Sequence, residues 1–394
     1  MFRLPHSFMN RRSHQNHVSS DAAQVPSFHA MAMSARAGML ERNGRRIRHL
    51  EVGQPAGGAP QGTLRAVEAA LRHGLGYTDA RGLPALIERI ATHYREQYGC
   101  EVDPRRIAVV SGASAGFTLA FVAAFDRGQR VGILEPGYPA YRNTLMALGL
   151  EPVAIPVGPD TGWAPTLEAL EAVGPLDGLI IASPSNPTGT ILDESALREI
   201  TAHCSQANVQ LVADEIYHGI TYGAAAATVA NIDDSAIVIN SFSKYFSMTG
   251  WRLGWMVVPP HLVDIVERLQ QNLYICAPHI SQVGGIAAFD CREELDARVE
   301  TYRNHRDLLI DGLAHAGITR LARPDGAFYL YADVGHLTDD SKRLCDRWLD
   351  ELAVATTPGL DFDLHDGHRF VRFSYAGRRE DLVEASELLA GWKP

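Results

Sequence analysis

The lysine at position 244 lies in a segment that could support covalent chemistry. Small, apolar and hydroxyl residues surround it in the run Ser241-Phe242-Ser243-Lys244. Removal of water from around an amine lowers its pKa, and a neutral amine can form a Schiff base with a carbonyl compound. Arg252, further along the chain, can bind an anion through two parallel hydrogen bonds, and the two serines add hydroxyl donors. The segment therefore predicts a reactive lysine beside an anion site.

Two other segments suit the remaining parts of such a ligand. The small residues at 111–116 precede an apolar helix from Phe117, so backbone N–H groups are free at the start of that helix and suit a phosphate. Asp214 ends a predicted buried strand, where an unpaired charge is too costly, so we expect it to have a cationic partner. A phosphate site, a lysine that seeks an aldehyde and a carboxylate that awaits a pyridinium together predict pyridoxal phosphate.

These polar groups follow strands that a sheet would place side by side. From about residue 106, short β-branched runs alternate with stretches of helical period, which is typical of βαβ units and a mostly parallel sheet. Ligands of open α/β sheets bind beyond the carboxyl ends of the strands. We therefore expect an α/β fold with one site shared by several strand ends. The predicted strands are 107–110, 131–134, 179–182, 209–213, 237–240 and 253–258.

The character of the chain changes after roughly residue 290. A charged amphipathic stretch at 293–314 precedes short predicted strands at 327–331 and 370–374, which indicates a smaller α+β domain. The first residues are rich in Arg, His, Ser and Asn, a composition that suits a disordered leader and faintly resembles a targeting segment. We therefore predict a leader at 1–30, a large cofactor-binding domain at 61–290 and a small domain formed by 31–60 with 291–394.

The composition excludes several classes of protein. With 36 basic and 46 acidic residues the formal charge is -10, so we expect no nucleic-acid partner. The longest apolar stretch, 117–125, is far shorter than the roughly 20 residues of a membrane-spanning helix, so we expect no membrane partner. The cysteines are odd in number and have no C-x-x-C spacing, which predicts reduced thiols, a cytoplasmic location and no metal site. They are Cys100, Cys204, Cys276, Cys291 and Cys345.

Four motifs in order carry a resemblance to a known family. They are Glu-Pro-Gly-Tyr at 135–138, Ser-Pro-Ser-Asn-Pro-Thr-Gly at 183–189, Asp-Glu-Ile-Tyr at 214–217 and the run from Ser241 through Gly254. Together they strongly resemble the class I/II pyridoxal-phosphate-dependent aminotransferases of fold type I, from about Gly53 through Arg372. The resemblance implies a large domain with a mostly parallel, seven-stranded type of sheet flanked by helices, and a smaller α+β domain.

The resemblance also implies a role for each matching residue around the cofactor. Lys244 would attach the cofactor as a Schiff base and move the Cα proton of the substrate, and Asp214 would pair with the pyridinium nitrogen. Asn186 and Tyr217 would bond to the phenolic oxygen, and Tyr138 would stack on the ring. The matches to the phosphate cup are Ala113, Ser114, Ser241, Ser243 and Arg252.

Three further matches concern the substrate and a second subunit. Arg372 would bind the substrate α-carboxylate, with Asn186 and the backbone of Gly53 beside it. Arg369 competes for this role, although alternation along a strand places 369 and 372 on opposite faces. Tyr77 matches a tyrosine that reaches the phosphate of the neighbouring subunit, which implies a homodimer.

The resemblance favours amino transfer between an L-amino acid and a 2-oxo acid by a ping-pong mechanism. No arginine stands between Leu269 and Cys291 to pair with a second substrate carboxylate, which favours a neutral or aromatic amino acid. A C–S lyase or a cyclopropane-forming synthase like ACC synthase stays open, because Lys244 and Asp214 would serve those reactions too. A regulator that binds the cofactor without catalysis is disfavoured, since the residues before Gly53 show no winged-helix pattern.

Overall fold

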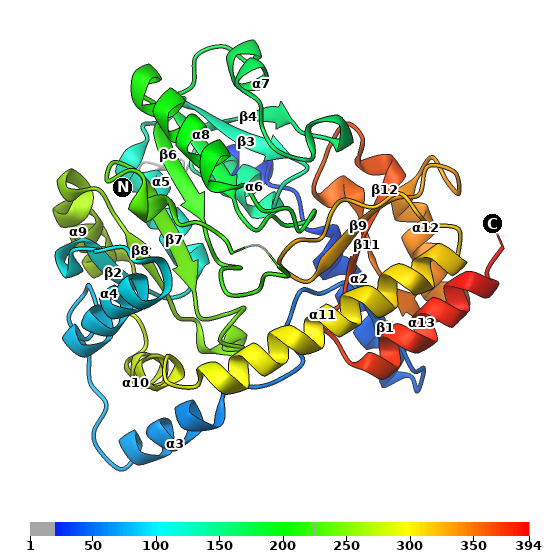
Figure 1. Ribbon diagram of the computed structural model, residues 1–394, viewed down its shortest axis with the longest axis horizontal. Coiled ribbons are helices and arrows are strands. Elements are labelled where there is room, and N and C mark those ends of the chain that lie inside the picture. Colours follow the sequence, from blue (N-terminus) through cyan, green and yellow to red (C-terminus); the bar gives the residue numbers. More distant parts are fainter. Residues whose placement is uncertain (1–19, 224, 394) are drawn as a thin grey trace, which may run out of the picture.

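The computed structural model describes residues 20–223 and 225–393, which build a large sheet and a smaller one beside it (Figure 1). The large sheet has the strand order β2-β8-β7-β6-β5-β3-β4. Neighbouring strands from β4 to β7 are parallel, while β8 is antiparallel to both β7 and β2. The predicted α/β fold with a mostly parallel sheet is therefore confirmed. The strands are β2 (Ile107–Val110), β3 (Arg130–Glu135), β4 (Glu151–Pro156), β5 (Gly178–Ala182), β6 (Gln210–Asp214), β7 (Ile237–Ser241) and β8 (Gly254–Val257).

Strand β4 is the one strand of this sheet that the hydrophobic pattern did not indicate. It contains Pro152 and Pro156 and begins with the exposed Glu151. It lies at the edge of the sheet, where one side of the backbone needs no ladder partner and proline is tolerated. A strand at this position can therefore form without the apolar run that marks the central strands.

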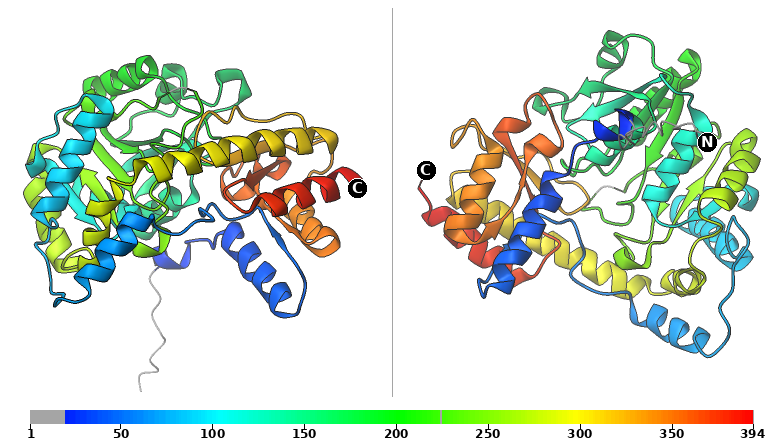
Figure 2. Two further views of the ribbon diagram at one scale, coloured as in Figure 1. Left: turned by 60° about the horizontal axis from the view of Figure 1, so that its bottom comes forward. Right: turned by 180° about the vertical axis from the view of Figure 1, so that it is seen from behind.

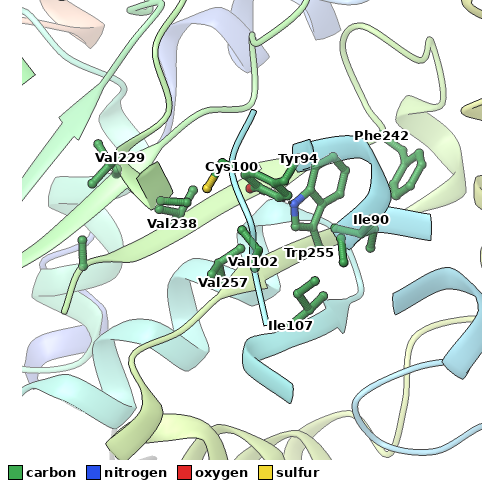
Figure 3. Close-up of a cluster of buried hydrophobic side chains, with 14 of the residues drawn as sticks. Ile90, Tyr94, Cys100, Val102, Ile107, Val229, Val238, Phe242, Trp255 and Val257 are labelled. Atoms are coloured by element: carbon green, nitrogen blue, oxygen red, sulfur yellow. Dashed lines mark hydrogen bonds between the residues drawn. The ribbon is translucent and has the colours of Figure 1, made fainter. Parts of the chain in front are cut away.

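Helices cover both faces of the large sheet, and alternate side chains of each strand belong to different cores. On β5, for example, Ile180 packs into one cluster and Ile181 into the other. Figure 3 shows part of the second cluster, in which the Trp255 indole donates a hydrogen bond of 3.2 Å to the Tyr94 hydroxyl. One face carries α5 (Ala113–Ala124), α6 (Pro139–Ala147) and α9 (Val263–Leu273); the other carries α4 (Pro84–Tyr98), α7 (Leu167–Ala172) and α8 (Glu194–Ala207).

The smaller sheet has the order β11-β12-β9 and is antiparallel. Beside it, β1 pairs in parallel with β10, so residues near 48 join the C-terminal part of the chain. The long helix α11 runs from the large-sheet region to the small one (Figure 1). The domain division at 61–290 and at 31–60 with 291–394 remains a prediction. The elements are α2 (His29–Arg42), β1 (Arg48–His49), α3 (Gln61–Ala70), α10 (His279–Ala288), α11 (Arg292–His315), β9 (Tyr329–Asp333), α12 (Ser341–Arg347), β10 (Val354–Ala355), β11 (Thr357–Pro358), β12 (Phe370–Ser374) and α13 (Arg379–Gly391).

The segment 20–30 forms the second part of the predicted leader. It contains the short helix α1 (Ser20–Ala23), and the Phe28 ring packs edge-on against Tyr138 with centroids 6.2 Å apart. Composition did not reveal this order, because the contacts come from distant parts of the chain. Residues 1–19 of the predicted leader lie outside the described residues. Among the helices that the structure describes, none is both long and apolar enough to cross a membrane.

Candidate active site

The strand ends meet at one edge of the large sheet, as predicted. Two adjoining cavities with volumes of about 360 and 250 Å³ lie there, and Lys244, Gly53 and Tyr138 line both. Strand β2 contributes to this edge because it and β7 are each antiparallel to β8 and so run in the same direction. The first cavity also contains Ala113, Ser114, Ser241, Ser243 and Arg252, and the second contains Asn186, Asp214, Tyr217 and Arg372.

The Lys244 amine lies between the two cavities. Its Nζ donates a hydrogen bond of 2.8 Å to the carbonyl oxygen of Gly53 and stands 5.6 Å from the centre of the Tyr217 ring. Burial and, to a smaller extent, the charge of Arg372 lower the pKa of the amine to about 8, while the charge of Asp214 opposes this shift. The amine is therefore available in its neutral, nucleophilic form near pH 8.

Gly53 is required where it stands, because the chain passes close to an aromatic side chain. A Cβ atom on Gly53 would lie 2.5 Å from the Cζ atom of Tyr329. Only glycine brings the backbone carbonyl close enough to receive Lys244 while leaving room for that ring. The family resemblance pointed to Gly53, whereas Tyr329 carried no signal in the sequence.

Asp214 is a buried carboxylate in the same cavity as the Lys244 amine. Its side chain accepts hydrogen bonds from the backbone N–H of Ile216, at 3.0 Å, and from the hydroxyl of Tyr141. Burial raises the pKa of Asp214 to about 6, although both hydrogen bonds oppose this shift. Within the described residues Asp214 makes no ion pair, so the cationic partner that we expected is not a side chain. A protonated ring nitrogen in the adjoining cavity would satisfy this carboxylate.

Tyr141 is a site residue that the sequence reasoning missed. It stands three positions after Tyr138, and α6 begins between them, so both rings lie at the same end of that helix. Their centroids are 5.4 Å apart and both line the two cavities, while the Tyr141 hydroxyl donates a hydrogen bond to Asp214. The spacing of the two tyrosines in the motif at 135–141 was a usable signal.

The opposite end of the site has the features of an anion cup. Helix α5 begins at Ala113, and its N-cap residue Gly112 has a φ of 84°. A Cβ atom on Gly112 would lie 2.9 Å from the Cζ atom of Arg252, so glycine permits the guanidinium to approach the start of the helix. The hydroxyls of Ser241 and Ser243 are 2.9 Å apart beside it. Helix N–H groups, a guanidinium and two hydroxyls suit a phosphate.

Arg372 is held rigidly in the second cavity. Its guanidinium donates hydrogen bonds to Asn186 Oδ1 at 2.9 Å and to the carbonyl oxygen of Glu51 at 2.6 Å. The rings of Tyr329 and Phe362 lie 4.3 and 4.7 Å from its central carbon. Its buried Nε has no partner within the described residues, so the arginine still has hydrogen-bonding capacity for an anion.

Arg369 lies outside the cavities. It forms a 2.6 Å ion pair with Asp333, and 41% of its side chain is exposed. Arg369 ends the short 3-10 turn at 367–369 that precedes β12, whereas Arg372 lies within the strand, and their surroundings differ accordingly. His218 shares a 2.8 Å hydrogen bond with the Tyr98 hydroxyl, and burial lowers its pKa to about 3.

Tyr77 is the one predicted site residue that the structure does not bring to these cavities. It lies in the loop between α3 and α4 and is 83% exposed. Within one copy of the chain it has no role in the site. A role for Tyr77 therefore requires a second subunit.

The comparisons with known proteins identify the family. The profile of the family "aminotransferase class I and II" matches residues 46–388. The valine–pyruvate aminotransferase of Mycobacterium tuberculosis is 44% identical over 378 residues, which cover 94% of this chain and 97% of that protein. The chain therefore belongs to the aminotransferase class I and II family.

Two solved structures support the same assignment. An aminotransferase from Mycobacterium tuberculosis has a TM-score of 0.93 and 43% identity, with 96% of this chain and 99% of that chain covered. The aspartate aminotransferase of Thermus thermophilus, solved with maleate, has a TM-score of 0.89 and 29% identity, with 95% and 99% covered. The protein is thus an aminotransferase of fold type I, and this class was predicted from the motifs. Amino transfer is accordingly favoured over the lyase and the non-catalytic regulator.

Proposed function

We propose that this aminotransferase uses pyridoxal phosphate to exchange an amino group between a neutral or aromatic L-amino acid and a 2-oxo acid. The observation that carries the proposal is the placement of the buried Asp214 carboxylate and the Lys244 amine in one cavity. A carboxylate without an ion pair suits the protonated nitrogen of the cofactor, and an amine with a lowered pKa suits its aldehyde.

The residues present fit the parts of this cofactor. The cup formed by Ser114, Ser241, Ser243 and Arg252, with the adjacent N–H of Ala113, would hold the phosphate. When bound, pyridoxal phosphate would supply an electron-accepting ring for the electron pair that stays on the substrate Cα after its proton is removed. These assignments remain proposals for each residue.

The protein's own groups would then perform the remaining tasks. Asp214 would hold a proton on the ring nitrogen, and Tyr138 would cover the ring. Asn186 and Tyr217 would donate hydrogen bonds to the ring oxygen. The Lys244 amine, freed when the substrate amine replaces it, would take the proton from the substrate Cα as a base and return it as an acid.

The substrate cavity favours an amino acid with one carboxylate. Among its lining residues, the cationic side chains are Lys244 and Arg372, and Arg372 is directed to the α-carboxylate. No second cation of the lining can therefore pair with an acidic substrate side chain. The wall is mainly apolar where Phe28, Met31 and Phe362 face the cavity. The Mycobacterium tuberculosis relative is named for valine and pyruvate, which supports the same class of substrate.

A panel of amino donors tests this proposal. Protein loaded with pyridoxal phosphate is mixed with each L-amino acid without an oxo acid, and formation of pyridoxamine phosphate is followed by absorbance. We expect valine, alanine, methionine or an aromatic amino acid to react faster than aspartate and glutamate. If aspartate reacted faster than the neutral and aromatic amino acids, the proposed substrate class would be wrong. Release of ammonia and an oxo acid without pyridoxamine phosphate would favour the lyase.

The homodimer and the location belong to the same proposal. Tyr77, at 83% exposure, would be buried against the phosphate cup of a second copy. The five cysteines are free thiols, which supports a cytoplasmic location. Amino acids and 2-oxo acids are the proposed small-molecule partners.

A further inference from the structure

The first turn of α2 forms one wall of the substrate cavity. Phe28, Ala30 and Met31 line this cavity together with Tyr138 and Arg372. The chain that leads to this turn crosses from the large-sheet region, where α1 lies, to the small-sheet region, where α2 lies (Figure 2). A substrate side chain that extends away from Lys244 and Arg372 therefore meets residues from the N-terminal segment.

A single carboxylate fastens this turn. The Asp361 side chain accepts hydrogen bonds of 2.7 Å from the backbone N–H of His29 and of 2.7 Å from that of Ala30. The N-cap residue of α2 is Phe28, which has no side-chain acceptor, and the helix makes no side-chain cap of its own. The first N–H groups of a helix need acceptors. Asp361, which is distant in the sequence, supplies the acceptors that a local cap residue would otherwise provide.

Asp361 is also tied to the large sheet. It is 4% exposed, and its carbonyl oxygen accepts a 3.3 Å hydrogen bond from Arg142 on α6. The other branch of the Arg142 guanidinium forms a 2.9 Å ion pair with Glu135, the last residue of β3. Asn143 adds a weaker bond of 3.4 Å to the carbonyl oxygen of Pro26. The position of the turn is thus set from both sides of the cavity.

We propose that Asp361 is a positioning residue that sets the side-chain selectivity of the aminotransferase by holding Phe28 and Ala30 against the substrate. The inference rests on the proposed function and adds the residue that controls which substrate side chains are preferred. Asp361 also borders the cavity, but both of its carboxylate oxygens bind the helix backbone, so the apolar side chains would supply the contact with the substrate side chain. One methylene in an apolar pocket changes kcat/KM by about 10-fold or more. Loss of this wall should therefore reduce the discrimination among neutral amino acids.

The test compares kcat/KM for alanine, 2-aminobutyrate, valine and leucine in the protein loaded with pyridoxal phosphate. In Asp361→Ala the ratio of valine to alanine should fall by about tenfold, chiefly through KM, because alanine barely reaches the wall. Asp361→Asn keeps one acceptor oxygen and should have an intermediate ratio. Cleavage of the segment 20–31 by a protease should become faster in both variants. A purely structural defect would lower kcat/KM equally for all four substrates.

Asp340→Ala is the matched control, because Asp340 caps α12 through the N–H of Arg343 and lies outside the cavity. It should leave the ratio unchanged. Phe28→Ala removes the wall directly and keeps the proposal testable if the Asp361 variants do not fold. An unchanged valine-to-alanine ratio in Phe28→Ala or in folded Asp361→Ala would overturn the inference. A wild-type preference for aspartate would instead overturn the proposed substrate class.

Discussion

At Lys244, opposing influences set the pKa of one amine. Burial and the nearby guanidinium groups of Arg372 and Arg252 lower it, whereas the Asp214 carboxylate raises it, and the outcome is a value of about 8. An amine with the usual pKa would be almost fully protonated at neutral pH and could act neither as a nucleophile nor as a base. The surroundings of Lys244 thus prepare it for the chemistry proposed above.

The Tyr141 hydroxyl in turn influences the pKa of Asp214. Its hydrogen bond lowers the pKa of Asp214 and so opposes the effect of burial. Tyr141→Phe should raise that pKa, and the protonated form of Asp214 cannot stabilise a protonated ring nitrogen. A hydrogen bond to a charged group contributes about 1.5 to 3 kcal/mol, so the acidic limb of kcat/KM should move up by about one to two pH units.

The measurement is the pH profile of kcat/KM for wild type and variant. We expect a larger loss at pH 6 than at pH 8. Tyr222→Phe is the control, because it removes another buried hydroxyl, which donates to the carbonyl of Ala327 away from the cavities. It should leave the profile in place. The same profile for Tyr141→Phe and wild type would show that the hydroxyl does not act on Asp214.

At the scale of the element, the two arginines differ because β12 contains Arg372 but not Arg369. Arg372 lies opposite Tyr331 of β9 and Thr357 of β11, in the middle of the smaller sheet. Arg369 immediately precedes the strand and points to Asp333 at the surface. The smaller sheet therefore supplies the site with one rigid cation, and its neighbours Tyr329 and Phe362 prevent it from turning away.

Replacement of these arginines should have unequal effects. Arg372→Ala should lower kcat/KM for every amino acid, because it removes the partner of a buried carboxylate that all substrates share. The loss of transition-state stabilisation should be about 2 to 5 kcal/mol. Arg369→Ala removes an exposed ion pair, which contributes only about 0 to 1 kcal/mol to stability, and should change activity little. Steady-state kinetics with several donors measures both. If Arg369→Ala raised KM and Arg372→Ala left the kinetics unchanged, Arg369 and not Arg372 would bind the substrate carboxylate.

At the scale of the whole molecule, the surface around Tyr77 has exposed apolar side chains. Leu64, Leu71 and Leu75 on α3 and the following loop are between 42% and 61% exposed. Large apolar side chains that are this exposed suit a protein interface, and homodimers are the commonest assemblies of soluble proteins. The proposed dimer would cover these side chains and bring Tyr77 to the other subunit's phosphate cup.

Mixed dimers test this proposal. Tyr77→Ala and Lys244→Ala should each be poorly active, since one lacks the phosphate contact and the other the reactive amine. After joint unfolding and refolding, the mixture should regain about a quarter of wild-type activity, because half of randomly paired dimers are hybrids with one complete site. Tyr77→Ala refolded alone is the control. A mixture no more active than its components, or a monomer by sedimentation, would contradict the shared site.

The sequence by itself determined the class of fold and the strand ends at which the site lies. The lysine, the aspartate and the asparagine follow different strands, and parallel strands bring their carboxyl ends to one edge whatever the details of packing. The match to the family motif likewise favoured Arg372 over Arg369 before any contact was known. These features depend on local periodicity and chain order, which a sequence displays directly.

Only the tertiary structure decided which groups support these residues. Tyr141 and Asp214 are 73 positions apart, Arg372 and the Glu51 carbonyl 321, and Asp361 and His29 332. The edge strand β4 was also not predicted, since its prolines break the hydrophobic pattern that indicates a strand. Contacts of this kind arise when separately formed elements pack together, and the periodicity of each element carries no information about its distant neighbour.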